Sequence, residues 1–265
     1  MIKEGDRIPT HEFKIRQKFY ENHEELFKLT DINQNMPPRD QWRTLHLDKL
    51  LENKRAIIIG VPGAFTPTCA KMHVPGFQIW YRHMKAMCID EIYVHGVNDP
   101  WVMWAWQKQQ GLLQTVMLPD GRGEFAEKLG TLVDMPYYNY GKRTWRYSMV
   151  VDNFIVEKMF VEPGFPDDYI DDPFGETSAL NMLKYLQSTG KVREEGYNPD
   201  MEFEDDQNAH IMPVEALHLS QSELIYHDQI AKKEYEEFKK SLDVNELREE
   251  LDEFEKTAKK FNSVE

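Results

Sequence analysis

The sequence predicts an α/β fold that carries a helical C-terminal extension. An apolar run, Arg55–Gly60, is followed by Pro-Gly and then by helix-compatible residues, as at the end of a buried strand. Strand and helix patterns then alternate, and a short turn later separates two β-rich runs. From Lys191 onward the composition becomes acidic and helix-like. Alternating strands and helices predict a sheet with helices on both faces.

The elements before the central strand are short. We expect a hairpin around Phe13 to Leu29, a loop at 33–38, and one or two helical turns at His46–Leu51. The β-branched run that ends at Gly60 is the first strand of the main sheet.

Between residues 69 and 129 helices and strands alternate. Capping residues and prolines mark the helix starts, with Asn98 or Asp99 before Pro100 as the clearest case. Pro75 should kink the first helix because proline removes an internal hydrogen bond. The predicted elements are a helix from Cys69 to about Met87, a strand at 92–97, a helix at 100–110, a strand at 115–118 and a helix at 124–129.

A hairpin and a last helix complete the pattern. Asp152-Asn153 lies between the β-rich runs Trp145–Val151 and Phe154–Val161, which predicts a hairpin with a two-residue turn. A helix follows at Ser178–Gln187. This order is the one that a thioredoxin fold produces, with a central mixed sheet covered by helices on both faces.

Residues 1–190 therefore form the predicted domain, and residues 191–265 form the extension. The extension carries a net charge of −11 out of the total of −14. Ser220-x-x-Glu223 and Asp243-x-x-Glu246 resemble capping boxes and predict helices near 221–240 and 244–261. A packing arm and a solvated tail both fit this composition.

Charge and composition exclude several classes of protein. An acidic chain without a basic stripe disfavours binding to nucleic acid or to anionic membranes. No apolar run approaches the roughly 20 residues that span a bilayer, and residues 1–6 lack a signal-peptide core, so we expect a cytoplasmic protein. The two cysteines do not form a disulfide framework.

Cys69 is the candidate nucleophile. It falls in the first turn of a predicted helix, where unpaired N–H groups and the helix dipole favour a thiolate. A small buried core residue is the alternative interpretation. Thr66 places a hydroxyl one turn earlier, and with Pro67 at the first helical position it also fits an N-cap.

These residues resemble the peroxiredoxin family. Pro62, Thr66 and Cys69 match the P-x-x-x-T-x-x-C signature, and the surrounding sequence is similar to the type II (peroxiredoxin-V) subgroup. The resemblance extends from about Lys3 to Gln187. Further similar stretches are His73–Phe77, Gly96–Pro100, Ala105-Trp106 and Arg143–Val151.

The resemblance implies a thiol peroxidase that reduces hydrogen peroxide and small alkyl hydroperoxides. It implies that Cys69 attacks the peroxide, Thr66 is its hydroxyl partner, Arg146 stabilises the thiolate and holds the peroxide, and Pro62 shields the sulfur. A structural ion pair is the alternative role for Arg146. Arg143 is the substitute candidate, although a surface position is expected for it.

No cofactor and no metal is predicted. Cys69 and His73 are four residues apart and could share a zinc ion, but no recognisable pair of further ligands is present. The resemblance gives His73 a structural hydrogen bond near the active-site helix.

The way in which the oxidised sulfur is recycled depends on the second cysteine. Cys88 lies 19 residues after Cys69, too far for a disulfide along an unbroken helix, and is predicted to be inert. The segment from Trp145 to Leu186 resembles the branch that uses glutathione or glutaredoxin, and the family implies a homodimer. The alternative function is a redox-sensing or chaperone-like interaction protein that acts through the acidic extension.

Overall fold

The computed structural model describes residues 1–16, 30–32, 42–112, 115–165 and 172–192. All of them belong to the first of two units of the chain, Met1–Val214. The helices predicted at 221–240 and 244–261, and the loop at 33–38, lie outside the described residues. Within those residues, no helix combines the length and the apolar character that crossing a bilayer requires.

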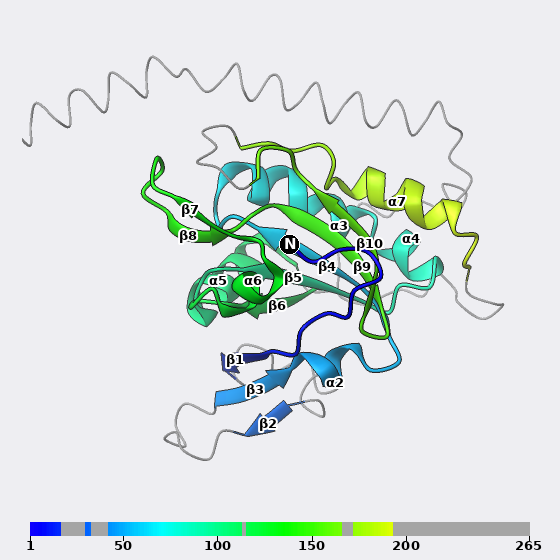
Figure 1. Cartoon of the computed structure of the whole chain (residues 1–265), viewed down its shortest axis with the longest axis horizontal. Coiled ribbons are helices and arrows are strands. Elements are labelled where there is room, and N and C mark those ends of the chain that lie inside the picture. Colours follow the sequence, from blue (N-terminus) through cyan, green and yellow to red (C-terminus); the bar gives the residue numbers. More distant parts are fainter. Residues whose placement is uncertain (17–29, 33–41, 113–114, 166–171, 193–265) are drawn as a thin grey trace, which may run out of the picture. The chain divides into compact units, whose positions relative to one another are not determined.

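A five-stranded mixed sheet forms the centre of the unit. Its strand order is β10-β9-β4-β5-β6 (Figure 1). β4, β5 and β6 are parallel to one another. On the other side of β4, β9 runs antiparallel to β4, and β10 runs antiparallel to β9 and so in the same direction as β4. The predicted α/β architecture is therefore confirmed. The strands are β4 (Arg55–Val61), β5 (Glu91–Gly96), β6 (Val116–Pro119), β9 (Tyr147–Asp152) and β10 (Ile155–Val161).

Helices cover both faces of this sheet (Figure 1). On one face α3 (Val74–Ile79) and α4 (Tyr81–Ala86) pack against α7 (Ala179–Ser188). The opposite face packs on α2, α5, α6 and a small three-stranded sheet, which share one apolar core with alternate residues of the central strands. The elements on that face are α2 (Leu47–Leu51), α5 (Pro100–Gln110), α6 (Glu124–Leu129), β1 (Glu12–Arg16), β2 (Thr30–Ile32) and β3 (Trp42–His46).

Most helices and strands predicted from the sequence begin and end within two residues of their bounds in the structure. Asp99 caps α5 as predicted, because its Oδ1 accepts from the Trp101 and Val102 amides at 2.9 and 3.1 Å. Ser178 caps α7. A glycine is required in β4, since a Cβ on Gly60 would lie 2.1 Å from the Tyr147 ring.

Strand pairing was harder to predict. Most of the hairpin expected around Phe13 to Leu29 lies outside the described residues. In the described part, β1 and β2 each pair with β3, and the sequence did not predict this pairing. The β9–β10 turn is shifted by one residue: Ile155 lies opposite Asp152, so Asn153 and Phe154 form the loop. Both have positive φ (43° and 77°), as a type I′ turn requires. The short hairpin of β7 (Leu132–Met135) and β8 (Gly141–Thr144) was not predicted.

The helix expected from Cys69 to Met87 consists of three consecutive pieces. Its first part, η3 (Cys69–His73), is a π-helical turn in which the Val74 amide bonds to the Cys69 carbonyl. Pro75 follows directly; it has no N–H, and its ring would collide with the carbonyl four residues earlier in a regular helix. The wider turn relieves that conflict. A second break at Trp80 separates α3 from α4.

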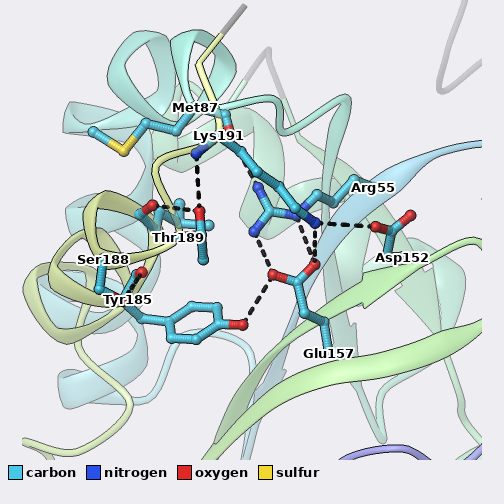
Figure 2. Close-up of polar contacts among 9 residues, drawn as sticks. Arg55, Met87, Asp152, Glu157, Tyr185, Ser188, Thr189 and Lys191 are labelled. Carbon is cyan, nitrogen blue, oxygen red and sulfur yellow. Dashed lines mark hydrogen bonds and ion pairs between the residues drawn. The ribbon is translucent and has the colours of Figure 1, made fainter.

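A polar cluster fastens α7 to the sheet (Figure 2). Arg55 binds Glu157 through two hydrogen bonds, Nε to Oε2 at 2.8 Å and Nη2 to Oε1 at 2.5 Å. Tyr185 donates to the same carboxylate at 2.9 Å, and Lys191 bridges it to Asp152. Glu157 is the extra residue of a β-bulge, which turns its side chain toward Arg55.

Burial alone would raise the pKa of Glu157, but the hydrogen bonds from Arg55 and Tyr185 lower it to about 2, from an ordinary 4.5. A lowered pKa contributes stability that is complete above pH 4.5 and is lost as the pH falls toward 2. We expect Glu157→Gln to lower the free energy of unfolding at pH 7 by about 2 kcal/mol. The difference from the parent should shrink below pH 4.5, as measured by urea denaturation at several pH values.

Glu124→Gln is the matched control. Glu124 pairs with Arg122 on the surface, where their side chains are 46% and 84% exposed. Its replacement should change stability by less than about 1 kcal/mol at any pH. A pH-independent loss in Glu157→Gln would contradict the proposed charge effect.

Candidate active site

The loop after β4 brings three predicted residues close together. Pro62 is buried directly after the strand, and Phe65 has a positive φ of 66°, which turns the chain back sharply. The Thr66 hydroxyl donates to the Gly63 carbonyl at 2.8 Å. A Cβ on Gly63 would lie 2.9 Å from Cγ2 of Thr66, so glycine lets this loop close tightly.

The helix begins at the end of this loop. The Thr66 carbonyl accepts the first helical bond, from the Ala70 amide at 2.9 Å, and Pro67 is the first helical residue. Thr66 is thus the residue before the helix, as predicted, but its hydroxyl bonds to Gly63. Cys69 lies in the first turn, forms no disulfide, and is fully buried.

Arg146 contacts Cys69 although the two residues are far apart in the sequence. Its Nη1 donates to the Cys69 Sγ at 3.3 Å, although the two residues are 77 positions apart. Arg146 directly precedes β9 and is 1% exposed. Arg146 shares a face with Ser148, while Tyr147 lies in the apolar core on the other face.

Arg146 keeps its positive charge beside the Cys69 sulfur. Burial alone would lower the pKa of Arg146, but the negative charges of Cys69 and Asp172 raise it above its ordinary value. The guanidinium therefore stays charged. Because attraction between two charges is mutual, a cation hydrogen-bonded to the sulfur stabilises its anionic form.

His73 is a neutral partner in this site. Its Nδ1 lies 3.4 Å from Arg146 Nη1. Burial, and then the charge of Arg146, hold the pKa of His73 well below its ordinary 6.5, while the Thr177 backbone acts in the opposite sense. A guanidinium only donates, so Nδ1 is the acceptor and the ring proton is on Nε2. In the described part of the chain, no group of three or more His, Cys, Asp or Glu could hold a metal ion.

The sequence analysis gave no role to the segment that carries Asp172 and Pro173, which binds the Arg146 guanidinium. Asp172 binds Nη2 of Arg146, and the Pro173 carbonyl accepts from Nε at 2.9 Å. The buried carboxylate of Glu162 fixes this segment by accepting from the Gly175 amide and from both the amide and the hydroxyl of Thr177, at 2.7–2.9 Å.

Two other candidates are placed elsewhere. Arg143 is half-buried rather than on the surface, and it donates to the Val97 and Tyr140 carbonyls. Burial raises the pKa of Tyr140, and so do the charges of Asp172 and Cys69. Cys88 follows α4 with a positive φ of 62° and is half-buried.

Comparison with known proteins agrees with this geometry. Residues 3–172 match the Redoxin family. The chain belongs to this family. Two Redoxin relatives are a peroxiredoxin of Rhizobium etli, 40% identical over 62% of this chain and 92% of the relative, and a hybrid peroxiredoxin, hyPrx5, of Haemophilus influenzae, 43% identical over 72% and 69%.

Solved Redoxin structures are similar too. The 1-Cys peroxiredoxin of Plasmodium falciparum, described as an antioxidant protein, is 28% identical with a TM-score of 0.61, and covers 70% of this chain and 99% of its own. The predicted peroxiredoxin resemblance and thioredoxin-like fold are thus confirmed.

Removing the charge of Arg146 should make the thiolate harder to form. In a Cys88→Ser chain, whose remaining cysteine is Cys69, we expect Arg146→Met to raise the pH midpoint of thiolate formation by about one unit or more. The ultraviolet absorbance of the thiolate measures this midpoint directly. Arg146→Lys keeps the charge and should give a smaller rise. An unchanged midpoint in Arg146→Met would exclude the electrostatic role.

Proposed function

We propose that this chain is a thiol peroxidase in which Cys69 reduces hydrogen peroxide and small alkyl hydroperoxides. The observation that supports this most is the 3.3 Å contact between Arg146 Nη1 and the Cys69 sulfur, which lies in the first turn of a helix. Similarity to peroxiredoxins supports it as well. A related structure, reduced Prx3 of Vibrio vulnificus, is described as a complex with hydrogen peroxide, at 26% identity and a TM-score of 0.56.

The reaction is a nucleophilic displacement at oxygen. The thiolate attacks the terminal oxygen, an S–O bond forms and the O–O bond breaks. Sulfur is oxidised by two electrons to a sulfenic acid, and the peroxide is reduced to an alkoxide or hydroxide, which takes up a proton. Negative charge therefore moves from sulfur to the leaving oxygen, and donors that face both atoms lower the barrier.

The surrounding groups have distinct roles in this proposal. Arg146 donates to the sulfur and is placed to stabilise the leaving oxygen. Since the Thr66 hydroxyl donates to Gly63, it is left as an acceptor for the proton of the peroxide. Amides in the first turn, such as that of Cys69, have no helical partner and supply further donors. Pro62 is buried beside this loop and excludes water.

Access to the sulfur favours small oxidants. Cys69 has no exposed surface, so a peroxide reaches it only when neighbouring side chains move. Hydrogen peroxide, which has only two non-hydrogen atoms, requires the least movement of these side chains. Phe65 and Pro67, in the loop just before Cys69, are exposed, and in this proposal a peroxide enters from the side of this loop.

Recycling requires a thiol from another molecule in this proposal. Cys88 lies beyond α4, at the other end of the three consecutive helical pieces that begin with Cys69. We therefore propose that glutathione or glutaredoxin resolves the sulfenic acid, and that the enzyme is a homodimer, as the resemblance implies. The alternative, an interaction protein, depends on an extension that lies outside the described residues.

Replacing the attacking sulfur should abolish the activity. We expect Cys69→Ser to lower the rate of hydrogen peroxide consumption with glutathione and glutaredoxin by about 10³-fold or more. Cys88→Ser is the matched control and should keep the parent rate within about twofold. A large loss in Cys88→Ser would instead identify Cys88 as the resolving thiol, and full activity of Cys69→Ser would refute the proposal.

The adduct formed during recycling distinguishes the routes. After one equivalent of hydrogen peroxide and then glutathione, we expect mass spectrometry to find glutathione on the peptide that contains Cys69. This disulfide forms when glutathione sulfur displaces the sulfenic oxygen as water. A disulfide between Cys69 and Cys88, with no glutathione adduct, would contradict recycling by an external thiol.

A further inference from the structure

We propose that Asp172 is a positioning residue that holds the Arg146 guanidinium in its productive orientation and, by its negative charge, limits how strongly Arg146 stabilises the Cys69 thiolate. This inference rests on the proposed peroxidase function. It assigns a role to a carboxylate that no sequence motif indicated.

The argument begins with the donors of Arg146. A guanidinium has five N–H groups in one plane, so two fixed contacts at different nitrogens determine its orientation. Asp172 binds at Nη2, and the Pro173 carbonyl accepts from Nε at 2.9 Å. Nη1 is then directed at the Cys69 sulfur and at His73 Nδ1. Asp172 and the Cys69 sulfur thus bind different nitrogens of the same guanidinium.

The segment that carries Asp172 is held firmly at its other end. Glu162 accepts three hydrogen bonds from Gly175 and Thr177, and the Ser148 hydroxyl donates to the Thr177 carbonyl at 3.1 Å. Phe174 lies between these anchors, with its ring centroid 5.5 Å from that of His73. The position of Asp172 is therefore determined by the fold rather than by its bond to Arg146 alone.

The carboxylate also affects the charge balance at the sulfur. A thiolate on Cys69 and the carboxylate of Asp172 share one guanidinium, and like charges oppose each other's ionisation. Among the described residues, the titratable groups near this pair include His73, which is neutral, and Tyr140, whose pKa is raised by burial and by both anions. Arg143 lies beside Tyr140, with its guanidinium carbon 5.5 Å from the ring centroid. Of these groups, Asp172 is the anion bound directly to Arg146.

Two substitutions separate orientation from charge. Asp172→Asn keeps an oxygen acceptor for Nη2 but removes the charge, so the pH midpoint of thiolate formation should fall by about 0.5–1 unit. Its maximal rate of peroxide reduction should stay within about threefold of the parent. Asp172→Ala also removes the acceptor, so its maximal rate should fall about 10-fold to 100-fold.

The midpoint is measured by thiolate absorbance in Cys88→Ser chains, and the rate by hydrogen peroxide consumption. Glu176→Gln is the control, because it removes one charge from an exposed side chain on the same segment. It should leave both values unchanged. A midpoint in Asp172→Asn equal to that of the parent would overturn the inference, as would a parent-like rate in Asp172→Ala.

The two readouts keep this inference separate from the proposed function. If the parent chain consumed no peroxide, the peroxidase proposal would fail, while the absorbance titration would still report how Asp172 affects the Cys69 sulfur. Thermal denaturation of each variant shows whether it is folded. If Asp172→Ala did not fold, the midpoint and the rate of Asp172→Asn would decide, and a lower rate with an unchanged midpoint would reject the inference.

Discussion

The contact between Arg146 and Cys69 is the interaction on which the site depends. An arginine that is 1% exposed is stable only when paired, since an isolated buried charge is strongly disfavoured. Three segments of the fold meet at this arginine. The residues just before β9 carry the guanidinium, the start of the helix carries the Cys69 sulfur, and the segment after β10 carries Asp172 and Pro173. Residues 77 positions apart meet because β9 lies next to β4 in the sheet.

A second buried arginine shows what makes this pairing unusual. Arg55, at the other end of β4, meets the carboxylate of Glu157 in a two-bond ion pair, and the pKa of Glu157 falls to about 2 after the opposing effect of burial. That pair is complete and holds the fold together. Arg146 is instead divided between a carboxylate and a sulfur, and the sulfur can react. An arginine thus serves stability at the start of β4, and another arginine, just before β9 and beside the end of β4, serves chemistry.

The sequence predicted what local chemistry determines. Asp99 and Ser178 mark their helix starts through hydrogen bonds to neighbouring amides. Pro67 marks its helix start because its φ is fixed and it lacks an N–H, and Cys69 therefore lies in a first helical turn. The role of Arg146 followed from the family resemblance. Asp172 and Glu162 could not be found in this way, because their roles come from long-range contacts that no spacing in the chain encodes. The same limit explains why the pairing of β1 with β3 and the β7–β8 hairpin were not predicted.

The proposed cycle gives the Asp172 contact a second consequence. When Cys69 becomes a sulfenic acid or a mixed disulfide, its sulfur loses the negative charge that paired with Arg146. Without another anion, a buried guanidinium would then be uncompensated, at a cost of about 3–5 kcal/mol. Asp172 remains bound to Nη2 whatever the state of the sulfur, so the oxidised protein keeps a neutralised arginine. In this proposal, the Asp172 carboxylate reduces the stabilisation of the thiolate before the reaction and keeps Arg146 neutralised after it. The reactant state is thus stabilised less and the product state more, and both effects favour turnover.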